Sequence, residues 1–131
     1  MKQLTFILLF LATANAGAEW TLVARGQLKE GTLTVYADPE TMSRADDFAK
    51  MWGLLDFSIP KLLKGKGEYS SIKFQEEFDC SQRRFRVLSL DLYSDNMSRG
   101  ELIASTSVGS EWKPLSPGSV DEAAWEAACT Q

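Results

Sequence analysis

The chain has 131 residues, with 18 acidic and 14 basic side chains, a formal net charge of −4 and no histidine. Without histidine there is no Ser-His-Asp or Cys-His catalysis and no histidine zinc site, and a negative charge disfavours general binding of nucleic acid or anionic membranes. Apolar residues make up 44% of the chain, which argues against disorder. We therefore expect one globular domain that is not an enzyme and uses no cofactor or metal.

Residues 1–18 have the pattern of a secretory signal peptide. Lys2 is followed by an uncharged apolar run at residues 4–14, and small residues at two possible cleavage sites precede Glu19. The run is shorter than the roughly 20 residues that span a membrane, and no cysteine near the cleavage sites could carry a lipid. A buried core helix is the alternative. We expect residues 19–131 to form the exported domain, without a membrane span or a lipid anchor.

The first half of this domain reads as short β-strands joined by loops. Residues 20–25 and 32–38 are β-prone, and the polar stretch between them predicts a hairpin connection. Pro39 lacks an N–H group for strand pairing, so the second strand is expected to end there. Residues 42–49 are predicted as a loop with at most one helical turn. A third strand is predicted at residues 50–58, followed by a loop at residues 60–67.

The clearest alternation of apolar and polar residues lies in residues 70–80, which predicts a strand with one buried and one wet face. The apolar positions are Ile72, Phe74, Phe78 and Cys80. The polar positions are Lys73, Gln75, Glu77 and Asp79. Glu76 is the exception, because this acidic residue falls on the apolar face.

A tight turn at residues 81–82 leads into a predicted strand at residues 83–94. One face of this strand contains Arg86, Leu88, Leu90 and Leu92, and the other contains Phe85, Val87 and Tyr93. A hairpin loop at residues 95–100 and a sixth strand at residues 101–108 follow. The connections are short, so the sequence predicts a meander of about six antiparallel strands.

The C-terminal end predicts a helix over residues 120–128, which are rich in alanine. Ser119 and Glu122 match a capping box, and Asp121 adds a second negative charge in the first turn, where the helix dipole favours it. Trp125 and Cys129 are four residues apart and therefore share one face of this helix.

Cys80 and Cys129 are the two cysteines of the chain. In an exported protein two cysteines usually pair, although two free thiols are the alternative. A disulfide would clamp the Trp125 face of the helix onto the apolar side of the sheet. The predicted fold class is therefore α+β, with an antiparallel meander sheet and a C-terminal helix tethered to one face by a disulfide.

Arg83, Arg84 and Arg86 form the main candidate for a partner-binding site. They could contact an acidic or sulfated partner, or they could pair across strands with acids such as Glu77 and Asp79. The second interpretation is the commoner one for arginines on a sheet. Three loop lysines have the same two interpretations, with solvation of the loop favoured: Lys61, Lys64 and Lys66.

Tryptophans and carboxylates provide further candidates. Trp52 could be an exposed contact for a protein partner, whereas Trp125 is expected in the core. A pair of carboxylates could act in acid–base catalysis, but charges on the wet face of a sheet are far commoner. The candidate carboxylates are Glu76, Glu77, Asp79 and Asp91.

Several short segments, taken in order, resemble the surface-adhesin protein E family of Gram-negative bacteria. They are VYAD at residues 35–38, MWGLLDF at 51–57, EFDC at 77–80, RRFRVLS at 83–89, WKPLSPGS at 112–119 and WEAAC at 125–129. Each piece is weak alone, but the ordered set with both cysteines spans the expected domain.

The resemblance implies a six-stranded antiparallel sheet with a C-terminal helix tethered by the disulfide, and often a homodimer. It also implies binding of host matrix and serum proteins such as vitronectin, laminin and plasminogen. The function expected is therefore that of an exported adhesin-like binding domain in the periplasm or at the cell surface. The alternative is a soluble periplasmic or envelope domain with a structural or small-ligand-binding role.

Overall fold

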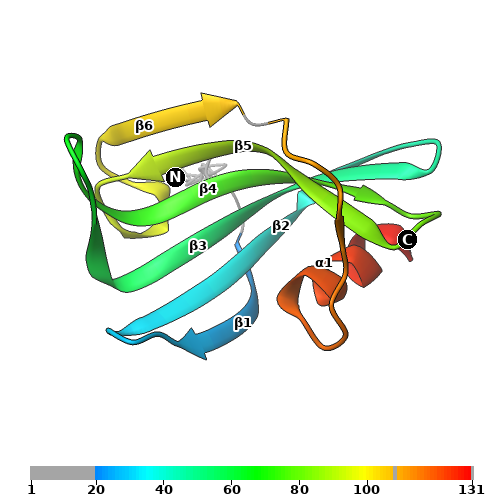
Figure 1. Ribbon diagram of the computed structural model, residues 1–131, viewed down its shortest axis with the longest axis horizontal. Coiled ribbons are helices and arrows are strands. Elements are labelled where there is room, and N and C mark those ends of the chain that lie inside the picture. Colours follow the sequence, from blue (N-terminus) through cyan, green and yellow to red (C-terminus); the bar gives the residue numbers. More distant parts are fainter. Residues whose placement is uncertain (1–19, 108, 131) are drawn as a thin grey trace, which may run out of the picture.

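The computed structural model describes residues 20–107 and 109–130, and Figure 1 shows their arrangement. The expected signal peptide, residues 1–18, lies outside the described residues. The elements are β1 (Thr21–Gln27), β2 (Thr32–Ala45), β3 (Phe48–Leu63), β4 (Gly67–Asp79), β5 (Arg84–Tyr93), η1 (Asn96–Ser98), β6 (Leu102–Ser107), β7 (Lys113–Pro114) and α1 (Val120–Cys129).

The strands form one antiparallel sheet in the order β1-β2-β3-β4-β5-β6, so each strand pairs with its neighbour in the sequence. This confirms the predicted six-stranded meander. A short seventh strand, β7, which the sequence did not predict, pairs with the first residues of β5 through Pro114 opposite Arg84. The segment between β6 and α1 thereby returns along the edge of β5 and delivers the helix to one face of the sheet (Figure 1).

The prediction that the second strand ends at Pro39 is wrong. The strand resumes after a bulge, because Asp38 pairs with Trp52 and Ser43 then pairs with Lys50. Pro39 lies inside this bulge, where a residue without an N–H group costs no ladder hydrogen bond. Thr41 helps to close the gap, since its Oγ1 accepts a 3.0 Å hydrogen bond from the backbone N–H of Trp52.

The predicted loop at residues 42–49 is therefore a hairpin in which β2 and β3 continue to a two-residue turn. Asp46 in this turn has a φ of 54°, a left-handed conformation that aspartate tolerates better than most residues. Backbone groups of Cys80 and Asp47 are joined by a 2.7 Å hydrogen bond, which ties the hairpin to the end of β4. This extended end of the sheet is the part on which α1 lies.

The prediction of a loop at residues 60–67 is also wrong, because a bulge again accommodates a proline within the strand. Asp56 pairs with Ser71 and Lys61 pairs with Tyr69, so Pro60 belongs to a second bulge and β3 continues to Leu63. The side chain of Asn96 in η1 donates a 2.8 Å hydrogen bond to the carbonyl of Phe57 inside this bulge. The short helical turn therefore supplies part of the backbone pairing that the bulge lacks.

A bulge in β5 changes which of its residues share a face. Gln75 pairs with Ser89 while Glu76 pairs with Val87, which leaves Leu88 without a partner position. Leu90 and Leu92 are consequently on the same face as Val87, although the sequence pattern grouped them with Arg86. The extra residue inverts the alternation, because side chains in a strand alternate with a period of two.

The helix packs on the face of the sheet that holds Phe78, which we call the covered face. Six buried residues form this core: Ala37, Ala49, Met51, Phe78, Trp125 and Ala128. Trp125 also donates a 2.8 Å hydrogen bond from Nε1 to the carbonyl of Asp79. The indole thus satisfies its polar group while it fills the space between helix and sheet.

Both ends of the helix are fastened as the sequence predicted. The Ser119 side chain caps the N-terminus by accepting a 3.1 Å hydrogen bond from the N–H of Glu122. Cys129 in the last turn is disulfide-bonded to Cys80, with the Cα atoms 5.4 Å apart, which confirms the predicted tether. Arg44 from the β2–β3 hairpin donates to the carbonyl of Cys129, where the helix dipole favours a positive charge.

Candidate functional site

The three candidate arginines divide between the two faces of the sheet. Arg83 lies in the turn before β5 and contacts the helix, with Nη2 3.0 Å from Glu122 Oε2. Its guanidinium carbon lies 4.5 Å from the centre of the Trp125 ring. Arg83 therefore helps to hold α1 in place, and its side chain is still 52% exposed.

Arg84 and Arg86 lie on the opposite face, away from the helix. Arg84 donates from Nε to Asp79 Oδ2 at 2.9 Å, and Arg86 donates from Nε to Glu77 Oε1 at 2.8 Å. These cross-strand ion pairs are the alternative that the sequence favoured for the arginines. Glu77 and Asp79 are buried beneath them rather than wet, because the long arginine side chains cover them.

The environment of Asp79 keeps this carboxylate charged. Burial alone would raise its pKa, but hydrogen bonds from Ser81 and Arg84 and the charge of Arg84 outweigh burial and lower the pKa. Removing Arg84 would leave a buried carboxylate without its cation, which is strongly destabilising. The ion pairs are therefore structural, and only the outer surface of each arginine is available to a partner.

Trp112 covers part of that outer surface, and both arginine side chains remain about one-third exposed. Its ring centre lies 4.7 Å from the guanidinium carbon of Arg84 and 4.4 Å from that of Arg86. The ring of Phe48 lies 5.8 Å from it. We call these four residues, Phe48, Arg84, Arg86 and Trp112, the arginine–tryptophan patch. The sequence pointed to the two arginines and left Trp112 either in the core or as an exposed contact, but it did not place Phe48 or Trp112 beside the arginines, because stacking between segments so far apart depends on the tertiary structure.

Trp52 and the loop lysines lie elsewhere on the molecule. Trp52 is half-buried on the same face as Arg86, with Lys73 Nζ 4.8 Å from its ring centre. Lys61 is placed over Phe57, whereas Lys64 and Lys66 are exposed in the β3–β4 turn. Trp52 therefore shares a face with the arginine–tryptophan patch, and the lysines belong to the other end of the sheet.

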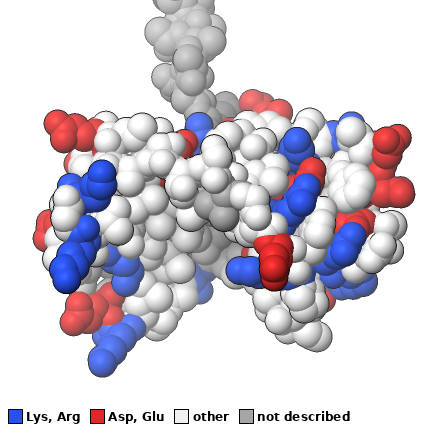
Figure 2. Space-filling model, turned by 45° about the horizontal axis from the view of Figure 1, so that its top comes forward, with Lys and Arg blue, Asp and Glu red and all other residues white. Residues whose placement is uncertain are grey.

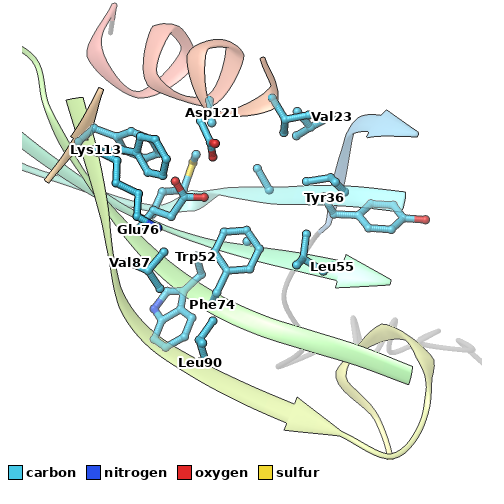
Figure 3. Close-up of a pocket in the computed structure, with 18 of the residues that line it drawn as sticks. Val23, Tyr36, Trp52, Leu55, Phe74, Glu76, Val87, Leu90, Lys113 and Asp121 are labelled. Atoms are coloured by element: carbon cyan, nitrogen blue, oxygen red, sulfur yellow. The ribbon is translucent and has the colours of Figure 1, made fainter. Parts of the chain in front are cut away.

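A cavity of about 410 Å³ lies between the covered face and the N-terminal half of α1 (Figure 3). Its walls are mostly apolar and include Val23, Leu55, Phe74, Val87 and Leu90. The helix is short and covers one end of the sheet, so the apolar face beyond it lines this hollow. The sequence contained one signal for it: Glu76 is the acidic residue in the apolar pattern of β4.

Glu76 lies at one end of this cavity, and its side chain points toward the helix (Figure 3). Only 7% of Glu76 is exposed, and its Oε2 has no hydrogen-bond partner among the described residues. Burial and, second, the negative charge of Asp121 raise the pKa of Glu76 to about 8. Burial also raises the pKa of Asp121, against the charge of Lys113.

Stability should consequently fall as pH rises through neutrality. Glu76 keeps its proton in the folded state up to about pH 8, whereas in the unfolded chain it ionises near 4.5. The folded state binds the extra proton within this window, so wild type should lose about 2–3 kcal/mol between pH 5 and pH 7. Urea denaturation across this range should show a flatter profile for Glu76→Gln, with exposed Glu68→Gln as the control. An identical slope in Glu76→Gln would contradict the assignment.

The candidate carboxylates do not converge as a catalytic pair. Glu77 and Asp79 are ion-paired on the opposite face, and Asp91 accepts a 2.6 Å hydrogen bond from Ser105. Glu76 instead faces Asp121, which the sequence placed only in the first turn of the helix. Within residues 20–107 and 109–130, no three Asp, Glu or Cys side chains are grouped to hold a metal ion, and no helix is long and apolar enough to cross a membrane.

The fold is that of a small domain in which a disulfide tethers one helix to an antiparallel sheet. The sequence profile described as surface-adhesin protein E matches residues 20–130. The chain belongs to this surface-adhesin family. No curated protein matches the sequence.

Solved structures of Haemophilus influenzae protein E have the same fold. Crystal form II of that protein is 12% identical, with a TM-score of 0.59 over 73% of this chain and 80% of the other. A second structure, from non-typeable Haemophilus influenzae, is 10% identical with a TM-score of 0.53 over 83% of this chain and 72% of the other. At such identities the likeness extends to the fold and not to individual binding residues.

Proposed function

We propose that this protein is an exported, adhesin-like domain that binds a host matrix or serum protein through the arginine–tryptophan patch. The observation that carries the proposal is Trp112, whose ring lies against both Arg84 and Arg86 on the face that α1 leaves free. Tryptophan and arginine are the residues most enriched at the energetic centres of protein interfaces. Membership of the surface-adhesin family supports a protein partner over other ligands.

The chemistry of the patch suits a polar protein surface. The side chains of Arg84 and Arg86 are 34% and 35% exposed, and their charges are already balanced by Asp79 and Glu77. Such arginines can donate hydrogen bonds to carboxylates or carbonyls of a partner, and the interface does not thereby acquire a large net charge. Figure 2 shows basic and acidic residues interspersed at both ends of the visible face. A partner is therefore selected by local stacking and hydrogen bonds rather than by one large charged field.

Display and assembly belong to the same proposal. The domain is released after Ala18, carries no lipid and forms a homodimer at the cell surface or in the periplasm. N-terminal mass analysis of the exported protein tests the first two points, and sedimentation equilibrium tests the third. A retained Met1 would contradict cleavage, and an acyl chain would contradict the absence of lipid. A monomer at micromolar concentration would contradict the homodimer.

Trp112→Ala should weaken binding to immobilised vitronectin or laminin about tenfold or more, because it removes a stacked aromatic anchor and leaves both ion pairs intact. Surface plasmon resonance is the measurement, and circular dichroism checks the fold. The matched control is Leu62→Ala, which removes an apolar side chain that is 73% exposed on β3. Trp52→Ala tests how far the surface extends.

Equal affinity of Trp112→Ala and wild type would exclude the patch. Failure of wild type to bind any matrix or serum protein would favour the alternative, a periplasmic or envelope domain with a structural or small-ligand-binding role. That alternative is supported by one feature of the structure, the cavity beside Glu76.

A further inference from the structure

The cavity beneath α1 has the size and lining of a small-molecule site. Its volume of about 410 Å³ falls within the range of known ligand pockets, and its walls are mainly apolar. Phe74 lies directly over Gly53, where an added Cβ would collide with the aromatic ring. The absence of a side chain at Gly53 therefore lets the Phe74 ring lie close to β3 as part of the wall.

The polar groups of the cavity gather at one end. Figure 3 shows Glu76 from the sheet and Asp121 from the helix projecting toward each other, with Lys113 beside them. The other elements against Glu76 contribute apolar residues, Met51 opposite it on β3 and Val87 opposite it on β5. Two carboxyl groups thus face one ammonium group, so ionisation of Glu76 would leave one negative charge at this end of the cavity without a cation.

Glu76 is a buried carboxyl group with an oxygen that the described residues leave unsatisfied. It is more than nine-tenths buried, it points into the cavity, and Oε2 makes no hydrogen bond within the described part of the chain. Buried polar atoms in native proteins nearly always have a partner, so an oxygen of this kind marks a place where a donor belongs. A cationic donor would supply both the hydrogen bond and the positive charge that an ionised Glu76 needs.

We propose that the cavity binds a small amphiphile with one protonated amine, its apolar body against Phe74 and Leu90 and its ammonium group on Glu76. This site is on the covered face, so the proposal stands independently of the arginine–tryptophan patch. Binding would draw the proton from the Glu76 carboxyl group to solvent, leaving a carboxylate paired with the ammonium ion. One proton is released to solvent for each amine bound, so charge and protons are conserved in the binding step.

The raised pKa of Glu76 gives this binding a defined pH dependence. Below about pH 8 the carboxyl group must lose its proton to pair with the amine, so the affinity should rise with pH up to that value. Asp121 from α1 and Lys113 from β7 face the same space and will modulate the dependence. Above pH 8 the affinity should level off while the amine remains protonated.

Isothermal titration calorimetry with octylamine, octanol and octanoate tests the proposal on the folded domain. At pH 7 octylamine should bind about tenfold or more tightly than octanol, and octanoate should bind most weakly. Titrations in two buffers with different ionisation enthalpies should show release of about one proton for octylamine. Octanol should release none.

Glu76→Gln should abolish the preference for octylamine over octanol and the proton release, while octanol binding stays unchanged. Glu68→Gln, which alters an exposed carboxyl group on β4, should behave as wild type. Leu55→Trp should weaken all three probes by filling the cavity. Equal affinities for the three probes in wild type, no binding of octylamine, or a preference that survives in Glu76→Gln would overturn the proposal.

Discussion

Loss of the disulfide should lower the stability of the domain more than any surface change. The bond joins residues 49 positions apart, and closing a loop of this length in the unfolded chain corresponds to about 4 kcal/mol. For a domain of this size such a loss lowers the melting temperature by roughly 15 °C or more. Cys129→Ser, measured by thermal denaturation, should show this shift.

The double variant Cys80→Ser/Cys129→Ser should have the same melting temperature as Cys129→Ser. Wild type in reductant should also have this lowered melting temperature. Ser116→Ala, an exposed change just before the helix, is the matched control and should have the melting temperature of oxidised wild type. If oxidised and reduced wild type melted within a degree or two of each other, the bond would not be the main tether of α1. Alkylation of two thiols in the purified exported protein would contradict the bond itself.

Truncation of Trp125 should have an effect of similar size, for a different reason. The side chain is 9% exposed and packs with Met51 and Phe78 where the helix meets the sheet. Trp125→Ala removes this packing and leaves a cavity, which typically costs about 3–5 kcal/mol. Urea denaturation should record the loss as a lower midpoint with an unchanged slope.

Trp125→Phe separates packing from hydrogen bonding. It retains most of the apolar volume but removes the 2.8 Å hydrogen bond to the carbonyl of Asp79, so it should cost about 1 kcal/mol. Glu126→Ala, on the exposed side of the same helix, should be nearly neutral. A Trp125→Ala variant as stable as Glu126→Ala would mean that α1 contributes little to the core.

Some residues of the arginine–tryptophan patch and of the cavity could be predicted from the sequence, and others could not. The pairing of Arg84 and Arg86 with the acids of β4 was open to prediction, because cross-strand neighbours in a hairpin follow from the turn. Trp112 could not be included, since it reaches the arginines through the return of β7 along β5. Glu76 stood out in the pattern, but its partner Asp121 is brought to it only by the docking of the helix.

Local patterning by itself determined the order of strands, the capped helix and the pairing of Cys80 with Cys129. These features depend on near neighbours, on the alternation of apolar residues and on the small number of cysteines. The strand lengths and the faces of β5 were decided only by the tertiary structure. Pro39 and Pro60 look like strand ends, yet bulges absorb them, and one bulge at Leu88 exchanges the faces of the residues after it. A bulge forms when partners elsewhere in the fold, such as Thr41 or Asn96, supply the missing hydrogen bonds, and its energy therefore depends on contacts that no single segment contains.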